Sequence, residues 1–199
     1  MKTLSEKVFI LIFIVSIHLM GQWSQNPALN LQVCDLNGEQ VLAKMVSLPD
    51  GGCYVSWFDT RNGSYNVFLQ KLSPLGNKLW QPNGLLISNH PQEAWLTDYD
   101  LIADVNNNAI LVFSDIRTGP NFQKPVAYKI NPSGEFLWGP NGIDISTPDE
   151  FQSSPKAVEL SDGNIAFAWM TSGTLTGIAL QKVSPAGVKL WNNPIIISG

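Results

Sequence analysis

One eight-residue motif occurs three times in this chain: Ser73-Pro74-Leu75-Gly76-Asn77-Lys78-Leu79-Trp80, Asn131-Pro132-Ser133-Gly134-Glu135-Phe136-Leu137-Trp138 and Ser184-Pro185-Ala186-Gly187-Val188-Lys189-Leu190-Trp191. We call this segment the tryptophan motif. A second aromatic position recurs as Trp57, Phe113 and Trp169, at spacings of 56 residues. Self-similarity at a period of this length is the signature of a repeat architecture. The chain of 199 residues is therefore best understood as three copies of one unit behind a distinct N-terminus.

Each repeat contains four segments with the apolar or alternating pattern of β-strands. In the first repeat these are residues 43–48, 53–58, 66–72 and 84–88. In the second and third repeats they are 100–105, 109–113, 125–130, 142–146, 156–160, 165–169, 178–183 and 194–198. Turns rich in Asp, Asn and Gly join the first strand of each repeat to the second, since these residues tolerate the positive φ of tight turns. The pattern predicts an all-β chain.

Four antiparallel strands repeated at this length predict the blades of a β-propeller. We expect a partial propeller of three four-stranded antiparallel blades, over about 40–88, 97–146 and 153–198, preceded by an orphan strand at about 23–34 that resembles a fourth strand. Large aromatic side chains fit the space between blades, where they bury much area. The expected structural anchors are Trp57, Trp80, Phe113, Trp138, Trp169 and Trp191.

Three blades leave the edges of the propeller open, and known propellers have about four to eight blades. The expectation is therefore that the chain is the N-terminal part of a longer protein, whose missing C-terminal blades complete the ring. The alternative is that copies of the chain pair to close it.

The N-terminus has the composition of a secretory signal peptide. Lys2 and Lys7 precede an apolar run from residue 8 to 15, so residues 1–21 are predicted to be removed on export. The run is shorter than the about twenty residues of a membrane span, and an uncleaved signal anchor is the alternative. The mature chain, residues 22–199, is then secreted, extracellular or on the cell surface, with the periplasm as another destination.

The composition argues against two classes of partner. Loss of two lysines and one glutamate with the signal peptide changes the formal net charge from −4 to −5. A mildly acidic chain without a basic cluster is a poor ligand for nucleic acid or anionic membrane. Export permits a disulfide between Cys34 and Cys53. However, Cys53 occupies the repeat position of Ala109 and Ile165, which favours a buried free thiol.

The first repeat carries the pattern Asp50-Gly51-Gly52-x-x-Val55-x-Trp57-x-Asp59-x-Arg61, followed by Gln70 and by Gly76-x-x-x-Trp80. This pattern resembles the repeat of secreted bacterial β-propeller proteins, many of which carry a C-terminal sorting domain for type IX secretion. The resemblance implies fold and export but no ligand. The second and third repeats depart from it, with Asn106-Asn107-Asn108 in the turn and Thr171 and Gly173 in place of Asp and Arg. A weaker resemblance to quinoprotein propellers is set aside because their usual Asp is absent, so no quinone or other cofactor is expected.

Two Asp-x-Arg pairs are the most site-like groups: Asp59 with Arg61, and Asp115 with Arg117. A carboxylate beside a guanidinium can bind a sugar or a phosphate. Their recurrence at equivalent repeat positions instead favours a structural role in fixing a loop. Residues that break the repeat are better binding candidates, because loops vary freely on a rigid scaffold. These are His90, Trp95 and Asp149, in the loops 89–95 and 147–151.

No catalytic constellation is evident. A nucleophilic triad would have only His90 as its base after signal cleavage, and zinc would lack clustered ligands. A faint calcium-loop spacing at Asp104, Asn106 and Asn108 is not expected to bind metal because it falls in a β-hairpin. A glycosidase needs two carboxylates that meet in a pocket, for which the candidates are Asp59, Asp98, Asp115 and Glu150.

The function expected from the sequence is a secreted, non-catalytic propeller that acts as a binding or adhesion scaffold for glycan or protein. The alternative is the propeller part of a secreted, glycosidase-like hydrolase with a carboxylate pair on its axial face. A structural spacer is a third, weaker alternative.

Overall fold

The computed structural model describes residues 26, 28–92, 98–117, 122–146, 150–174 and 176–197. These residues form three four-stranded antiparallel sheets and no helix, so none of them forms a helix that could cross a membrane. Blade 1 consists of β1 (Gln40–Ser47), β2 (Cys53–Asp59), β3 (Asn66–Leu72) and β4 (Leu85–Ser88). Blade 2 consists of β5 (Asp100–Ala103), β6 (Ala109–Asp115), β7 (Lys124–Ile130) and β8 (Ile143–Asp144). Blade 3 consists of β9 (Phe151–Glu159), β10 (Ile165–Ser172), β11 (Gly177–Val183) and β12 (Ile195–Ile197).

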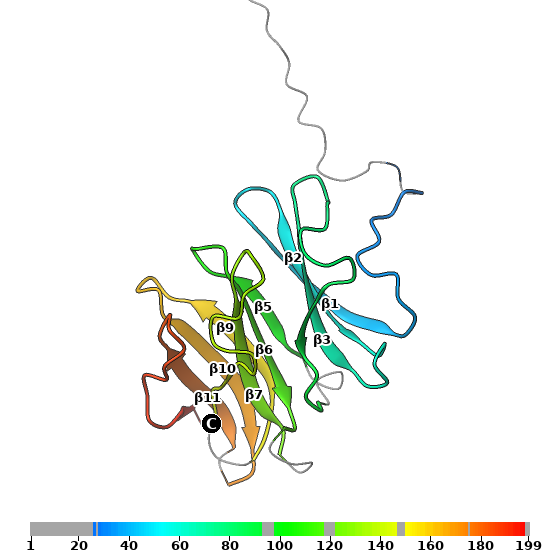
Figure 1. The fold of residues 1–199 in the computed structure, drawn as a ribbon. Helices are drawn as coiled ribbons and strands as arrows, with labels where there is room; N and C mark the ends of the chain where they lie inside the picture. The colour runs from blue at the N-terminus through cyan, green and yellow to red at the C-terminus, as the bar shows by residue number, and fades with distance from the viewer. Residues whose placement is uncertain are drawn as a thin grey trace, which may run out of the picture.

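The expected fold class, an all-β partial propeller of three blades, is confirmed. Within each sheet the strands lie side by side in the order in which the chain makes them. The three sheets stack face to face in chain order, from cyan through green to red (Figure 1). The first strands of neighbouring blades contact each other, β1 with β5 and β5 with β9. These strands therefore form the inner wall of the propeller.

The hydrophobic core is divided into layers between blades. One layer joins blades 1 and 2 and includes Phe58 and Phe113, whose rings meet edge to face at 6.5 Å. A second layer joins blades 2 and 3 and includes Trp138 and Trp169. Because side chains alternate along a strand, β6 of the middle blade packs one face on blade 1, through Leu111 and Phe113, and the other on blade 3, through Ile110 and Val112. A third, smaller cluster covers the outer side of blade 1, where Trp57 packs with Val33 and Cys34.

The tryptophan motif links each blade to the next. Trp80 Nε1 of blade 1 donates a hydrogen bond to the carbonyl oxygen of Pro132, at 3.2 Å, and Trp138 Nε1 donates to that of Pro185, at 3.1 Å. Both acceptors are the proline of the next motif, so the contact repeats with the blades. Trp191 holds the equivalent position in blade 3, where it is half-buried and belongs to none of the three core clusters.

The inner strands carry a feature that the sequence pattern does not show. β1 has an irregularity between Val41 and Lys44, opposite Trp57, and β9 has one opposite Trp169. The first bulged residue has positive φ in both strands, 55° at Leu42 and 53° at Ser154. Extra residues of this kind bend a strand and increase its twist. Here they lengthen β1 and β9 at their N-terminal ends beyond the predicted starts at residues 43 and 156.

The described part of the range predicted for the orphan strand contains no strand. Residues 28–34 form turns, bends and irregular chain, whereas Trp23 and the signal peptide lie outside the described residues. This segment instead lays Val33 and Cys34 against blade 1. Cys34 and Cys53 are both free thiols, and Cys53 is buried, as its repeat position predicted.

Candidate functional site

The first Asp-x-Arg pair is an internal clamp of blade 1. Asp59 is completely buried. It accepts a hydrogen bond from Trp57 Nε1 at 3.1 Å and forms an ion pair with Arg61 at 2.5 Å. Arg61 also stacks on the ring of Phe68, 3.8 Å from its centroid, and donates to the carbonyl oxygen of Asn83 at 3.0 Å. Burial favours the neutral acid, but the hydrogen bonds from Arg61 and Trp57 outweigh it and hold the pKa of Asp59 below its ordinary value. The clamp thus ties the end of β2 to the segment before β4.

The second pair repeats this clamp in blade 2. Arg117 makes an ion pair of 2.5 Å with the buried Asp115 and donates to the carbonyl oxygen of Asn141 at 2.6 Å. It also donates to the hydroxyl of Tyr128 at 3.0 Å; the ring of Tyr128 stacks on Phe113, although its repeat position is that of Gln70 in blade 1. Because both charges of each pair are engaged within the blade, neither pair is free to hold a sugar or phosphate.

Blade 3 has lost the clamp. Thr171 and Gly173 replace its Asp and Arg, and Trp169 Nε1 is buried without a hydrogen-bond partner among the described residues. Glu150 approaches from the loop before β9 and accepts hydrogen bonds from Thr171 Oγ1 at 3.5 Å and from the backbone N–H of Thr174 at 3.0 Å. Glu150 thereby ties two segments of its own blade together.

The loop after β4 brings His90 to blade 2. His90 Nε2 lies 3.2 Å from Asn141 Oδ1. The backbone carbonyl oxygen of the same Asn141 accepts the hydrogen bond from Arg117. The structure therefore brings two predicted residues, His90 and Arg117, to the exposed Asn141, while the buried Asp115 holds Arg117 from behind. Trp95 and Asp149 lie outside the described residues.

Three charged side chains meet on the inner strands. Asp98, just before β5, forms ion pairs with Lys44 of β1, at 2.7 Å, and with Lys156 of β9. One carboxylate of blade 2 is therefore shared by a lysine from each neighbouring blade. Partial burial favours the neutral acid, but hydrogen bonds from Lys156 and Lys44 outweigh this effect and lower the pKa of Asp98 to about 2.

The carboxylates considered for hydrolysis are each engaged in a different place. Asp59 and Asp115 are buried in the clamps of their own blades, Asp98 bridges the inner strands, and Glu150 binds the β10–β11 loop. A glycosidase needs one carboxylic acid with a raised pKa beside a carboxylate. The pKa values of Asp59 and Asp98 are instead lowered, which suits permanent ion pairs better than proton donation.

The calcium-like spacing at Asp104 is a buried ion pair. Asp104 accepts hydrogen bonds from the backbone N–H groups of Asn106 and Asn108 and pairs with Lys129 at 2.8 Å. Asn107 takes the positive φ of 62° that glycine provides in the other two hairpins. The ammonium group of Lys129 neutralises this carboxylate, and no cluster of potential metal ligands occurs among the described residues.

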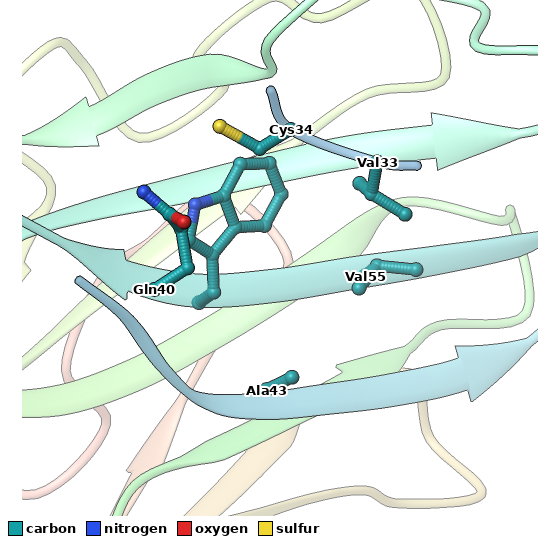
Figure 2. Close-up of a pocket in the computed structure, with 6 residues that line it drawn as sticks. Val33, Cys34, Gln40, Ala43 and Val55 are labelled. Atoms are coloured by element: carbon teal, nitrogen blue, oxygen red, sulfur yellow. The ribbon is translucent and has the colours of Figure 1, made fainter. Parts of the chain in front are cut away.

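A small apolar pocket lies on the outer side of blade 1. It has a volume of about 180 Å³ and is lined by Val33, Cys34, Gln40, Ala43, Val55 and Trp57. Figure 2 shows Val33 and Cys34 on the N-terminal segment, facing Val55 of β2 and Ala43 of β1. The pocket contains little polar surface, so it suits an apolar side chain better than a sugar.

Sequence reasoning missed four participants. Asn83 and Asn141 carry a signal, since both lie in a Pro-Asn-Gly triplet that follows the tryptophan motif. Lys44 and Lys156 also stand at equivalent repeat positions, 112 residues apart. Their meeting at Asp98 depends on the contact between blades.

Comparison with known proteins identifies similar folds only. No protein-family model matches the chain, and no curated protein is found as a relative. The intramolecular trans-sialidase from Ruminococcus gnavus, solved with oseltamivir carboxylate, is 15% identical, with a TM-score of 0.49 over 79% of this chain and 36% of that one. The endo-arabinase from Bacteroides thetaiotaomicron VPI-5482 is 13% identical, with a TM-score of 0.43 over 79% of this chain and 61% of that one. The chain thus spans about a third and three fifths of these two proteins.

Proposed function

We propose that this chain is a non-catalytic, exported propeller scaffold that binds a glycan or a protein through the loops between its blades. The observation that supports the proposal is that its candidate acidic side chains are already engaged in ion pairs. Asp59, Asp98 and Asp115 are each held by lysine or arginine within or between blades. Such ion pairs rigidify a scaffold. The residues that differ from blade to blade lie in the connecting loops, where binding residues are commonly found.

The boundary between blades 1 and 2 is the described part of the proposed binding surface. His90 and the side chain of Asn141 are presented on its exposed side, and the backbone of Asn141 is fixed by Arg117. An imidazole and an amide together offer donors and acceptors for sugar hydroxyls or peptide groups. Export is part of the proposal and is supported by the basic and apolar pattern of residues 1–21.

The test is binding measured together with turnover. The purified chain, fluorescently labelled, is applied to an array of oligosaccharides and incubated separately with a panel of nitrophenyl glycosides. We expect saturable binding that the double variant His90→Ala/Asn141→Ala reduces, with no release of nitrophenol. Lys189→Ala, which removes an exposed side chain in the third tryptophan motif, is the matched control and leaves binding unchanged.

Two results would contradict this proposal. Release of nitrophenol that is lost in Asp98→Asn would support the hydrolase alternative. Binding that the double variant and the control lower equally would mean that this boundary is not the binding surface.

A further inference from the structure

We propose that the layer between blades 2 and 3 holds a buried water molecule, which accepts the hydrogen bond of Trp169 Nε1 and bridges it to the hydroxyl groups of Ser114 and Thr171. This site lies in the interior of the described blades, so it is independent of the binding surface proposed above. Two observations support it. Two buried polar atoms of the layer lack a protein partner among the described residues, and the layer has smaller side chains than its equivalent between blades 1 and 2.

The two buried polar atoms are Trp169 Nε1 and Ser114 Oγ. Trp169 is 2% exposed and Ser114 is 0% exposed. Neither atom has a hydrogen-bond partner in the part of the chain that the structure describes. An indole N–H or a hydroxyl removed from water without a hydrogen bond costs free energy, so buried polar groups are nearly always satisfied by protein or by ordered water. Both atoms therefore require a partner.

Both side chains face the same layer. Val112 and Trp169 belong to the hydrophobic cluster between blades 2 and 3, and Ser114 lies two residues beyond Val112 on β6. Side chains two residues apart on a strand share a face. By repeat position, Ser114 and Trp169 correspond to Phe58 and Phe113, whose rings lie 6.5 Å apart between blades 1 and 2. Repetition of that contact brings the hydroxyl of Ser114 beside the indole.

The side chains at this place are smaller than those of the equivalent layer. Between blades 1 and 2, Phe58 packs on Tyr99 and Phe113, with centroid distances of 4.9 and 6.5 Å. The equivalent residues between blades 2 and 3 are Ser114, Pro155 and Trp169. Two six-membered rings are lost, and only a pyrrolidine ring and the second ring of an indole are gained. One water molecule takes about 30 Å³ in the liquid, which is less than the volume of a single six-membered ring.

Blade 1 shows what the indole N–H binds at this repeat position. Trp57 Nε1 donates a hydrogen bond to the carboxylate of Asp59 at 3.1 Å. In blade 3 the residue in place of this aspartate is Thr171, whose side chain has one oxygen instead of two. A water molecule can replace the missing carboxylate oxygen, because it accepts from the indole and still has hydrogen bonds for the hydroxyls of Thr171 and Ser114. Three polar partners are typical of a buried water.

Water suits this place better than an anion does. Glu150 Oε2 lies 3.5 Å from Thr171 Oγ1. An anion beside that hydroxyl would be repelled by the nearby carboxylate. A water molecule is neutral and can donate as well as accept, so it meets no such repulsion.

NMR of the unmodified chain gives the direct test. The indole N–H resonances are recorded in an isotope-labelled sample, and Trp169→Phe identifies the resonance of Trp169. Cross-relaxation with water protons should give a cross-peak at this resonance, with the sign that a long-lived bound water produces. Trp57 is the matched control within the same molecule, because its buried N–H is bonded to Asp59. The N–H of Trp57 should give no such cross-peak.

The variant Thr171→Asn provides the second measurement. Asparagine places a side-chain oxygen where blade 1 has that of Asp59, without burying a charge. It should abolish the water cross-peak of Trp169, while the indole N–H stays protected from hydrogen exchange. Thr174→Asn is the matched control, because Thr174 is exposed in the same blade, and it should leave the cross-peak unchanged.

Four results would overturn the proposal. The first is the absence of a water cross-peak at Trp169 in the unmodified chain. The second is a cross-peak of equal size at Trp57, which would show general access of solvent to the layers. The third is a cross-peak that persists unchanged in Thr171→Asn. The fourth is a saturable shift of the Trp169 resonance on titration with chloride, which would assign the site to an anion.

Discussion

Replacement of Gly187 by alanine tests the contact through which one blade holds the next. Gly187 has a φ of +84°, and a Cβ built there would lie 2.7 Å from Cδ1 of Trp138 in the preceding blade. The left-handed backbone costs about 1–2 kcal/mol for an L-residue, and overpacking costs about 1–3 kcal/mol more. We therefore expect Gly187→Ala to lower the free energy of unfolding by about 2–5 kcal/mol.

Gly63→Ala is the matched control because it separates the two causes. Gly63 has nearly the same φ, +89°, but nothing lies within 4 Å of its added Cβ. It should lose only the backbone part, about 1–2 kcal/mol. Urea unfolding, followed by tryptophan fluorescence and by circular dichroism, measures both variants, and coincident transitions justify a two-state treatment. Equal losses for the two variants would refute the reasoning, because they would show that the Trp138 contact contributes no packing constraint.

Three further predictions concern charged groups. Arg61→Met or Arg117→Met leaves a buried carboxylate unpaired and should cost about 3–5 kcal/mol in urea unfolding at pH 7, and a loss below about 1 kcal/mol would show that the clamp is not needed. Lys129→Met should lower the free energy of unfolding by a similar amount, because it leaves the Asp104 carboxylate unpaired. The double variant Asp104→Leu/Lys129→Met, which introduces the leucine found at this position in the other two repeats, should regain most of that stability. A double variant no more stable than Lys129→Met would contradict this. Because the pKa of Asp98 is lowered from 3.8 to about 2, its contribution to stability is present above about pH 4 and is lost as the pH falls towards 2. Asp98→Asn should therefore flatten the acid limb of the stability profile in this window, and an unchanged limb would argue against the lysine bridge.

The sequence predicted the blades because the features that define them are local. The Pro-x-Gly turns and the apolar second strands need only neighbouring residues to be recognised, and the predicted bounds of the third strand in blade 1, residues 66–72, match β3. The bulges in β1 and β9 could not be predicted, because Leu42 and Ser154 are not residue types that signal positive φ. Both lie opposite the repeated aromatic position, Trp57 in blade 1 and Trp169 in blade 3.

The candidate site was less predictable than the fold because its partners are distant or belong to the backbone. Arg61 and Arg117 donate hydrogen bonds to the backbone carbonyl oxygens of Asn83 and Asn141. Because every residue has a backbone carbonyl group, no residue type in the sequence marks these acceptors. The sharing of Asp98 by two lysines requires the inner strands of three blades to be in place. Such contacts between blades follow from the architecture, and no short motif encodes them.

The bond from each motif tryptophan to the next motif has a consequence for synthesis. The carbonyl oxygen that accepts the hydrogen bond of Trp80 lies 52 residues further along the chain, and the acceptor of Trp138 lies 47 residues further. At about 5–20 residues per second, a ribosome needs roughly 3–10 s to supply the acceptor. Throughout elongation, the most recently made blade therefore shows an uncovered apolar sheet and an unbonded indole. The growing tip therefore exposes the same kind of surface, an apolar sheet face beside an unbonded indole, after the first blade and again after the second.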